Sequence, residues 1–111
     1  KWGVVHDALP VVGVGVYLEL DADGRTIDGR FAVGGLAVGP QRSAAAEKRI
    51  RDGLDPDDET SLRGAAAAAA EELETDDDPW ISAQYKTHLI ERLGTELLAR
   101  AAQRARNHGN A

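Results

Sequence analysis

Residues 10–20 alternate between branched apolar side chains and small or polar ones. The apolar side of this alternation is Val12, Val14, Val16 and Leu18, and the other side is Val11, Gly13, Gly15, Tyr17 and Glu19. A period of two with β-branched residues predicts a β-strand. Glycine inside a strand often marks the close approach of another group. We therefore expect something to lie close against the glycine-bearing face.

A second strand is predicted to pair with the first through a tight turn. The turn is Asp21-Ala22-Asp23-Gly24, in which Gly24 can adopt a positive φ. The extended pattern continues over residues 25–38, and its apolar positions are Ile27, Phe31, Val33 and Val38. We expect Gly34-Gly35 to interrupt it as a bulge or bend, and Gly39-Pro40 to end it.

After Pro40 the apolar period becomes that of helices. Ser43 is suited to cap a short helix over residues 44–51, which Gly53 ends. The segment 55–58, Asp-Pro-Asp-Asp, is typical of a helix start, and the helix that follows runs to about Leu73. Its alanine-rich stripe permits a close contact between helices and consists of Leu62, Ala65, Ala66, Ala69 and Leu73.

The longest predicted element is a last helix over residues 82–106, capped by Ser82 or Asp78. Its apolar residues repeat every four positions, and they are Ile81, Tyr85, Leu89, Leu93, Leu97 and Ala101, with Ile90 and Leu98 beside them. We expect Tyr85, Leu89, Leu93 and Leu97 to be buried against the sheet. Strands followed by helices indicate an α+β fold. The predicted architecture is a single domain over residues 1–111, with a small antiparallel sheet of two to three strands on which three helices pack.

The composition excludes several classes of protein. The 111 residues suffice for one domain and contain no cysteine, which excludes disulfides, thiolate metal sites and a thiol nucleophile. There are 19 acidic and 13 basic side chains, a formal net charge of −6, so we expect no nucleic acid and no anionic membrane as partners. No apolar run approaches the roughly 20 residues that span a bilayer. Asp7 comes too early for a signal peptide, and we expect a cytoplasmic protein.

The acidic excess has two explanations. Asp outnumbers Glu, Arg outnumbers Lys, and both Cys and Met are absent. A salt-rich cytoplasm favours an acidic, lysine-poor protein, and a GC-rich genome produces much of the same bias. Both explanations stay open at this point.

Three local motifs hint at ligands, but each fits a structural role better. Gly13-Val14-Gly15 lacks the third glycine of a dinucleotide fingerprint and lies inside a predicted strand. Asp21, Asp23 and Gly24 begin like a calcium loop, but its twelfth position holds Ala32 in place of Glu. Asp76-Asp77-Asp78 places three carboxylates side by side in a loop, where they cannot all converge on one cation. We interpret this run as a solvated approach to the last helix.

The three histidines offer no catalytic arrangement either. His6 and His108 lie near the two ends, and His88 lies on the last helix with Glu91 and Arg92 three and four positions later. No zinc-protease pattern and no clear Ser–His–Asp set is present. We interpret His88 as a flanking or core residue. The residues by themselves predict no active site, so an independent enzyme is the least favoured function.

Short motifs follow one another in a characteristic order along nearly the whole chain. The hairpin at residues 21–24 leads into residues 27–37, then to Pro40 and Arg42. Further matches are Ala45-Ala46-Glu47 and Gly53 for the first helix, and Ser82, Tyr85, Lys86, His88, Leu89 and Leu93 for the last. In this order the chain resembles the C-terminal domain of the flavoprotein subunit of carbon monoxide dehydrogenase-type molybdenum hydroxylases. The same family includes the FAD portion of xanthine dehydrogenase.

The resemblance implies a role inside a larger protein. In that family the flavin subunit carries FAD mainly on two upstream domains, and electrons reach the FAD from iron–sulfur clusters on another subunit. The family has a lysine just before the first strand of this domain, which makes Lys1 the candidate for a peripheral flavin contact. Val4, Val5 and His6 stand where the family often has a basic pair. The implied partners are the upstream FAD-binding domains and the iron–sulfur and molybdenum subunits.

Two functions of different classes follow. The first is a non-catalytic accessory domain of the flavin subunit, which supports electron transfer from iron–sulfur clusters to FAD and helps to dock subunits. The alternative is a stand-alone protein-interaction module with the same fold and no redox role. We expect this chain alone to bind no FAD, because the predicted helix starts carry acidic residues that would repel a pyrophosphate: Asp55, Asp57, Asp58 and Asp78.

Overall fold

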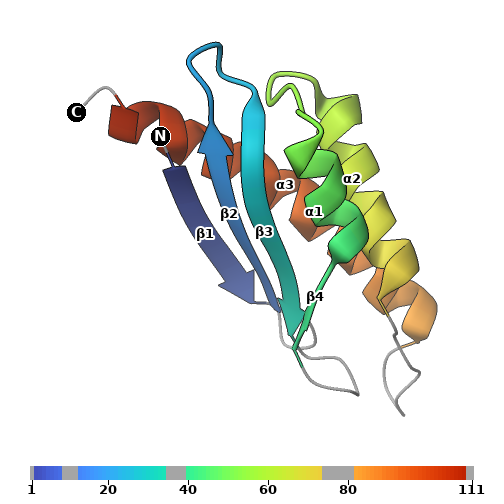
Figure 1. The fold of residues 1–111 in the computed structure, drawn as a ribbon. Coiled ribbons are helices and arrows are strands. Elements are labelled where there is room, and N and C mark those ends of the chain that lie inside the picture. The colour runs from blue at the N-terminus through green and yellow to red at the C-terminus, as the bar shows by residue number, and fades with distance from the viewer. Residues whose placement is uncertain (1, 9–12, 35–39, 74–81, 110–111) are drawn as a thin grey trace.

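An antiparallel sheet forms one layer of the protein (Figure 1). The computed structural model describes residues 2–8, 13–34, 40–73 and 82–109. Within these ranges the strands are β1 (Trp2–Ala8), β2 (Gly13–Leu20), β3 (Thr26–Gly34) and β4 (Gln41–Arg42), and they lie in the order β1-β2-β3-β4. Every strand therefore pairs with its neighbour in the sequence.

The sheet contains more strands than the two to three that the sequence predicted. β1 pairs with β2 from Trp2, opposite Glu19, to Ala8, opposite Gly13. The two-residue β4 pairs with the end of β3. Apolar and polar side chains do not alternate cleanly along β1, so the sequence did not predict this strand. Its pairing with β2 defines it. The α+β class and the three helices are confirmed.

The turn between β2 and β3 has the predicted form. Gly24 adopts a φ of +85°, and the carboxylate of Asp21 accepts hydrogen bonds from the backbone amides of Asp23 and Arg25. The register between the strands shifts at Glu19/Leu20. Gly34 ends β3, and Gly35 lies outside the described residues, so the interruption at this pair stays a prediction.

The helices begin and end close to the predicted positions. They are α1 (Ala44–Arg51), α2 (Glu59–Glu72) and α3 (Ala83–Gly109). The N-caps are Ser43 for α1 and Asp58 for α2, and the hydroxyl of Ser82 accepts a hydrogen bond from the amide of Tyr85 in the first turn of α3. Gly53, with a φ of +96°, turns the chain after α1.

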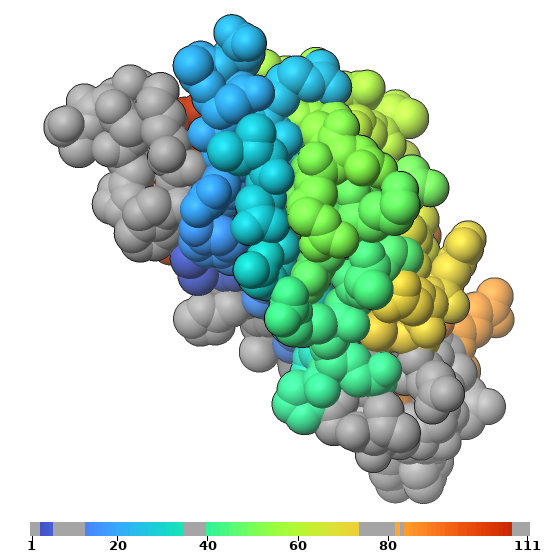
Figure 2. All heavy atoms as spheres, viewed as in Figure 1, coloured from blue at the N-terminus to red at the C-terminus, as the bar shows by residue number. Residues whose placement is uncertain are grey.

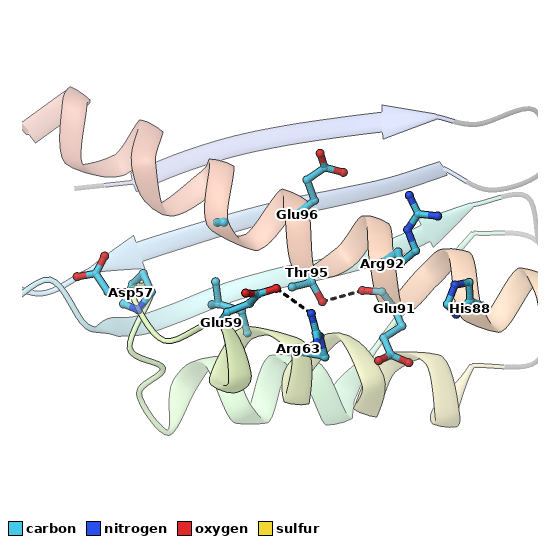
Figure 3. A pocket seen from close by; sticks show the side chains of 11 residues that line it. Asp57, Glu59, Arg63, His88, Glu91, Arg92, Thr95 and Glu96 are labelled. Carbon is cyan, nitrogen blue, oxygen red and sulfur yellow. Dashed lines mark hydrogen bonds and ion pairs between the residues drawn. The ribbon is translucent and has the colours of Figure 1, made fainter.

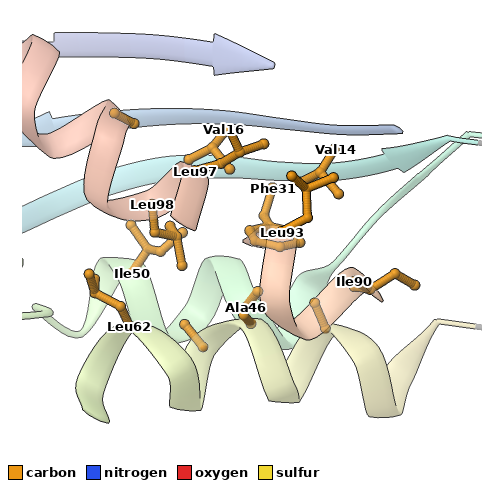
Figure 4. Packing of buried hydrophobic residues seen from close by; sticks show 14 of the residues in the cluster. Val14, Val16, Phe31, Ala46, Ile50, Leu62, Ile90, Leu93, Leu97 and Leu98 are labelled. Carbon is orange, nitrogen blue, oxygen red and sulfur yellow. The ribbon is translucent and has the colours of Figure 1, made fainter. Parts of the chain in front are cut away.

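The core lies between the sheet and the helices (Figure 4). Alternate residues of β2 and β3 face the helices, and they include Val14, Val16, Leu18, Phe31 and Val33. α3 packs on β1 and β2, α1 packs on β3, and α2 packs on both other helices (Figure 1). The alanine-rich stripe of α2 is buried as predicted, together with Leu62 and Leu73.

The expected burial of Tyr85 is wrong. Tyr85 is 51% exposed, whereas Leu89, Leu93 and Leu97 are buried as expected. A spacing of four residues overshoots one helical turn by about 40°, so a strict four-residue stripe rotates around the helix. The contact face of α3 is therefore centred on Leu93 and Leu97 and has rotated away from Tyr85.

Candidate functional site

The start of α1 is closed by side chains from two different elements. The carboxylate of Glu72, at the end of α2, accepts hydrogen bonds from the amides of Ala44 at 2.9 Å and Ala45 at 2.7 Å. Ser43 Oγ accepts the amide of Ala46 at 3.1 Å. A helix start attracts anions because its first amides lack partners. Here a carboxylate already occupies that place, so a phosphate group would have to displace Glu72.

The starts of the other two helices are also supplied with acceptors. Asp58 Oδ1 accepts the amide of Thr60 at 3.0 Å, and Asp55 Oδ1 accepts the amide of Asp57 at 3.0 Å. These carboxylates repel a second anion. At α3 the hydroxyl of Ser82 serves as the acceptor. The other predicted cap, Asp78, lies outside the described residues.

A buried carboxylate joins α1 to the sheet. Glu47 is 4% exposed and accepts hydrogen bonds from Arg42 Nε at 2.9 Å, Arg42 Nη2 at 2.6 Å and the amide of Phe31 at 3.1 Å. Burial raises the pKa of Glu47, but these hydrogen bonds outweigh burial and the pKa is lowered overall. The same ion pair raises the pKa of Arg42. Glu47 is thus held as an anion and bonded on both oxygens, which suits a structural anchor.

Four polar residues gather on the sheet face opposite the helices. The Tyr17 hydroxyl donates to Glu19 at 2.7 Å, and Arg30 pairs with Asp28 at 3.1 Å. Tyr17 lies opposite Arg30 and Glu19 opposite Asp28 across β2 and β3. The bond to Glu19 raises the pKa of Tyr17. The amide of Gly29 is the main cause that lowers the pKa of Asp28.

A groove of about 740 Å³ runs between α2 and α3 (Figure 3). His88 lies exposed at one end of it, which fits the flanking role and excludes a core position. Both acidic and basic side chains line the groove, and Glu59 and Arg63 already pair at 2.7 Å. At the start of α2, Asp57 pairs with Arg106 at 3.0 Å. The groove therefore contains no nucleophile paired with a base. Its mixed charges also give no electrostatic potential of a single sign that would attract a charged ligand.

The remaining residues that the sequence suggested as possible ligand-binding positions have structural roles or lie outside the described residues. Gly13-Val14-Gly15 lies inside β2, away from any strand-to-helix turn. Asp21 uses its carboxylate to close the hairpin. Residues outside the described ranges are Lys1 and Asp76-Asp77-Asp78, and the side chains of His6 and His108 are not described either. The flavin contact of Lys1 stays a prediction.

The described residues form neither a candidate metal site nor a helix that could span a membrane. No group of three or more His, Cys, Asp or Glu side chains lies close enough together to hold a metal ion within residues 2–8, 13–34, 40–73 and 82–109. Over the same ranges, each helix is too short or too polar to cross a bilayer. The ordered polar groups of this part of the chain mainly stabilise its own helices and turns.

Comparison with known proteins identifies the family. Residues 4–105 match the CO dehydrogenase flavoprotein C-terminal domain. The chain belongs to this family. The match covers nearly the whole sequence, as the order of motifs predicted. A comparison with curated proteins found no match.

Solved structures of longer chains share the fold of this CO dehydrogenase flavoprotein C-terminal domain. Quinoline 2-oxidoreductase from Pseudomonas putida 86 matches with a TM-score of 0.79 at 24% identity, over 94% of this chain and 37% of its own. Carbon monoxide dehydrogenase from Hydrogenophaga pseudoflava, in a form that lacks the Mo-pyranopterin moiety, matches with a TM-score of 0.71 at 22% identity. This match covers 94% of the present chain and 36% of the dehydrogenase chain. Reconstituted CO dehydrogenase from Oligotropha carboxidovorans matches with a TM-score of 0.71 at 21% identity, again over 94% of this chain and 36% of its own. The chain therefore spans just over a third of each of these proteins' matched chains.

The roles of Glu47 and Glu72 were not predicted from the sequence. A capping box places Glu at the third helical position, but Glu47 is one residue later and turns toward the sheet. Its position beside buried Ala46 and Ile50 on α1 was a signal that it faces the core. Glu72 bonds residues that precede it by more than 25 positions, so no local pattern could reveal its role.

Proposed function

We propose that this chain is the C-terminal accessory domain of the FAD-carrying subunit of a molybdenum hydroxylase in the cytoplasm. It supports electron transfer from iron–sulfur clusters to FAD by completing the fold of the flavin subunit and by helping to dock the partner subunits. The observation that carries this proposal is the family match over residues 4–105. The match covers only 36–37% of each solved relative's chain, which supports a domain that acts within a longer protein.

The described polar groups do not fit the binding of FAD by this chain alone. A pyrophosphate requires unpaired amides or basic side chains, and a helix start usually supplies them. The start of α1 already binds the carboxylate of Glu72, and the start of α2 carries Asp57 and Asp58. The proposal therefore places the flavin on upstream domains, with Lys1 as the one peripheral contact.

The first test is to isolate the chain with whatever accompanies it. A tagged chain should be purified from its native host under gentle conditions, either as part of a longer polypeptide or with separate partners. We expect FAD, detected by its absorbance, and molybdenum, detected by elemental analysis, in stoichiometric amounts. A solitary chain with neither would contradict the proposal and support the stand-alone interaction module.

The second test concerns FAD itself. The purified 111-residue chain should be titrated with FAD at micromolar concentrations and followed by flavin fluorescence and calorimetry. We expect no saturable binding. Stoichiometric binding would show that the domain carries its own flavin site and is not accessory. FMN, which lacks the adenylate half, is the matched control for any signal caused by the isoalloxazine ring alone.

A further inference from the structure

The two edges of the sheet are closed to different degrees. Beyond the short β4, β3 forms one edge, and Figure 2 shows α1, in green, next to β3, in cyan. The amide of Phe31 donates to Glu47 Oε2 at 3.1 Å, and its carbonyl accepts the amide of Ser43 at 2.9 Å. The amide and the carbonyl of Gly29 are bonded by the side chains of the residues on either side of it. This edge therefore offers no free backbone groups at Phe31 or Gly29.

β1 forms the other edge, and the order of the described strands places none beyond it. An antiparallel strand directs the amide and the carbonyl of every second residue toward the same side. The carbonyl of Val4 accepts a hydrogen bond from Arg104 Nη1 at 3.1 Å, so Val4 is one of the residues that point away from β2. By this alternation, the outward backbone groups of β1 belong to Trp2, Val4, His6 and Ala8. Among the described residues, Arg104 is the one side chain that bonds to them.

Arg104 reaches this edge because α3 packs tightly against the start of β1. A Cβ atom built on Gly3 would overlap the backbone of Ala101 and Ala105, which lie one turn apart on α3. Glycine therefore lets the strand and the helix approach more closely than any other residue would. Arg104 precedes Ala105, and its guanidinium group extends from there to the carbonyl of Val4. The close contact at Gly3 thus holds Arg104 beside the edge.

β1 itself has few features that would prevent another strand from pairing with it. Its residues include no lysine, arginine or proline, which natural edge strands use to block a further strand. Asp7 is its one charged side chain when the histidines are neutral, and Val4 is 44% exposed. A free edge beside an exposed apolar side chain favours pairing with the same edge of a second copy, because two-fold symmetry brings identical surfaces together.

We propose that Arg104 blocks the free edge of β1 and so prevents two copies of this chain from pairing through their β1 strands. Such pairing requires each copy to break the hydrogen bond from Arg104 to Val4. The two-fold axis also brings both guanidinium groups to one interface, where like charges repel. The inference concerns the chain itself and goes beyond the proposed function, so it holds for an accessory domain and for a stand-alone module.

Arg104→Ala removes the blocking side chain, and Arg92→Ala is the matched control. Arg92 is an exposed arginine of the same helix that lines the groove between α2 and α3, so both variants lose one positive charge from α3. Sedimentation velocity of the 111-residue chain, over a range of concentrations at neutral pH, measures self-association. We expect Arg104→Ala to form particles of two copies, because its outward backbone groups gain partners. Its dissociation constant should be at least about tenfold lower than those of the native chain and of Arg92→Ala.

A rescue variant shows whether the contact forms through β1. Val4→Lys, added to Arg104→Ala, places a lysine at an exposed position of the strand and should restore the self-association of the native chain. Circular dichroism should show that each variant keeps the native fold. Arg104→Gln, which removes the charge but keeps much of the side chain, replaces Arg104→Ala if that variant does not fold.

Three outcomes overturn the inference and leave the proposed function standing. The first is equal self-association of Arg104→Ala and Arg92→Ala. The second is self-association of Arg104→Ala that Val4→Lys leaves unchanged, because the contact then lies elsewhere. The third is a native chain that already forms pairs which Val4→Lys alone separates, because Arg104 then does not block the edge.

Discussion

The guanidinium group of Arg42 and the carboxylate of Glu47 form a two-point ion pair that fastens β4 to α1. Its distances are 2.9 Å from Nε and 2.6 Å from Nη2. Glu47 also accepts the amide of Phe31 in β3, so one buried side chain links three elements. Arg42 is 60% exposed, so its charge stays hydrated if the pair is broken. The link therefore depends mainly on Glu47.

Replacement of Glu47 should weaken the fold in a pH-dependent way. At pH 7, Glu47→Gln should lower the free energy of unfolding by about 1–3 kcal/mol, because a charged hydrogen bond to a buried group is lost. The pKa of Glu47 lies below its ordinary value of 4.5 in the folded protein. Its contribution is therefore complete above that value and is lost as the pH falls through the folded pKa.

Urea unfolding at several pH values between 7 and 3 measures this effect. The difference between the native protein and Glu47→Gln should shrink below about pH 4.5, because Glu47 becomes protonated as well. Asp52→Asn is the control, since it removes an exposed ion pair with Lys48 and should cost at most about 1 kcal/mol. A constant difference over the whole pH range would contradict the assigned charge of Glu47.

Loss of the cap that Glu72 provides should destabilise α1 from a distance. Glu72→Ala removes both acceptors of the amides of Ala44 and Ala45, and by the usual value of a helix cap it should cost about 0.5–2 kcal/mol. Glu71→Ala, on the neighbouring exposed residue, is the matched control and should change stability by at most about 0.5 kcal/mol. Equal effects of the two variants in urea unfolding would show that Glu72 has no special role.

The rotated contact face of α3 can be tested with two substitutions one turn apart. Leu89 is 7% exposed, and Leu89→Ala should cost about 2–5 kcal/mol. Tyr85→Ala alters an exposed side chain and should cost at most about 0.5 kcal/mol. Thermal and urea unfolding of both variants give the comparison. A loss below about 0.5 kcal/mol for Leu89→Ala would mean that the register of α3 is wrong.

Two helical glycines should respond to alanine with opposite signs. A Cβ on Gly94 would lie 2.7 Å from Phe31 Cζ, inside the core, so Gly94→Ala should cost about 1–3 kcal/mol through overpacking. A Cβ on Gly64 would meet only the end of the Arg49 side chain, at 3.3 Å, which can move away. Gly64→Ala should therefore stabilise the protein by roughly 0.5–1 kcal/mol through helix propensity. Stabilisation by both variants would indicate a looser core beside Phe31.

The acidic excess leads to a prediction about salt. If the bias reflects adaptation to a salt-rich cytoplasm, repulsion among like charges should weaken the fold at low ionic strength. The melting temperature should then rise between dilute buffer and molar potassium chloride. A flat melting temperature would leave genome composition as the cause of the net charge of −6. Sorbitol at matched osmolality is the control for effects of water activity.

The sequence by itself determined the elements with strong local signals. Alternating valines marked β2, the Asp-rich turn marked the hairpin, and Ser43, Asp58 and Ser82 marked the helix starts. These features depend on neighbours within about four residues, which is the range of strand alternation, turns and caps. The order of motifs also indicated the family, which the match over residues 4–105 confirms.

Only the tertiary structure decided the features that join distant segments. The pairing of β1 with β2, the link from Glu47 to Phe31 and the cap from Glu72 to α1 each join separate elements. Tyr85 is exposed, contrary to the prediction, because packing along the whole helix decides which side of α3 faces the sheet. The sheet face without a helix likewise follows from α3 packing on β1 and β2 and α1 packing on β3, with α2 packing on those two helices, which no single segment encodes.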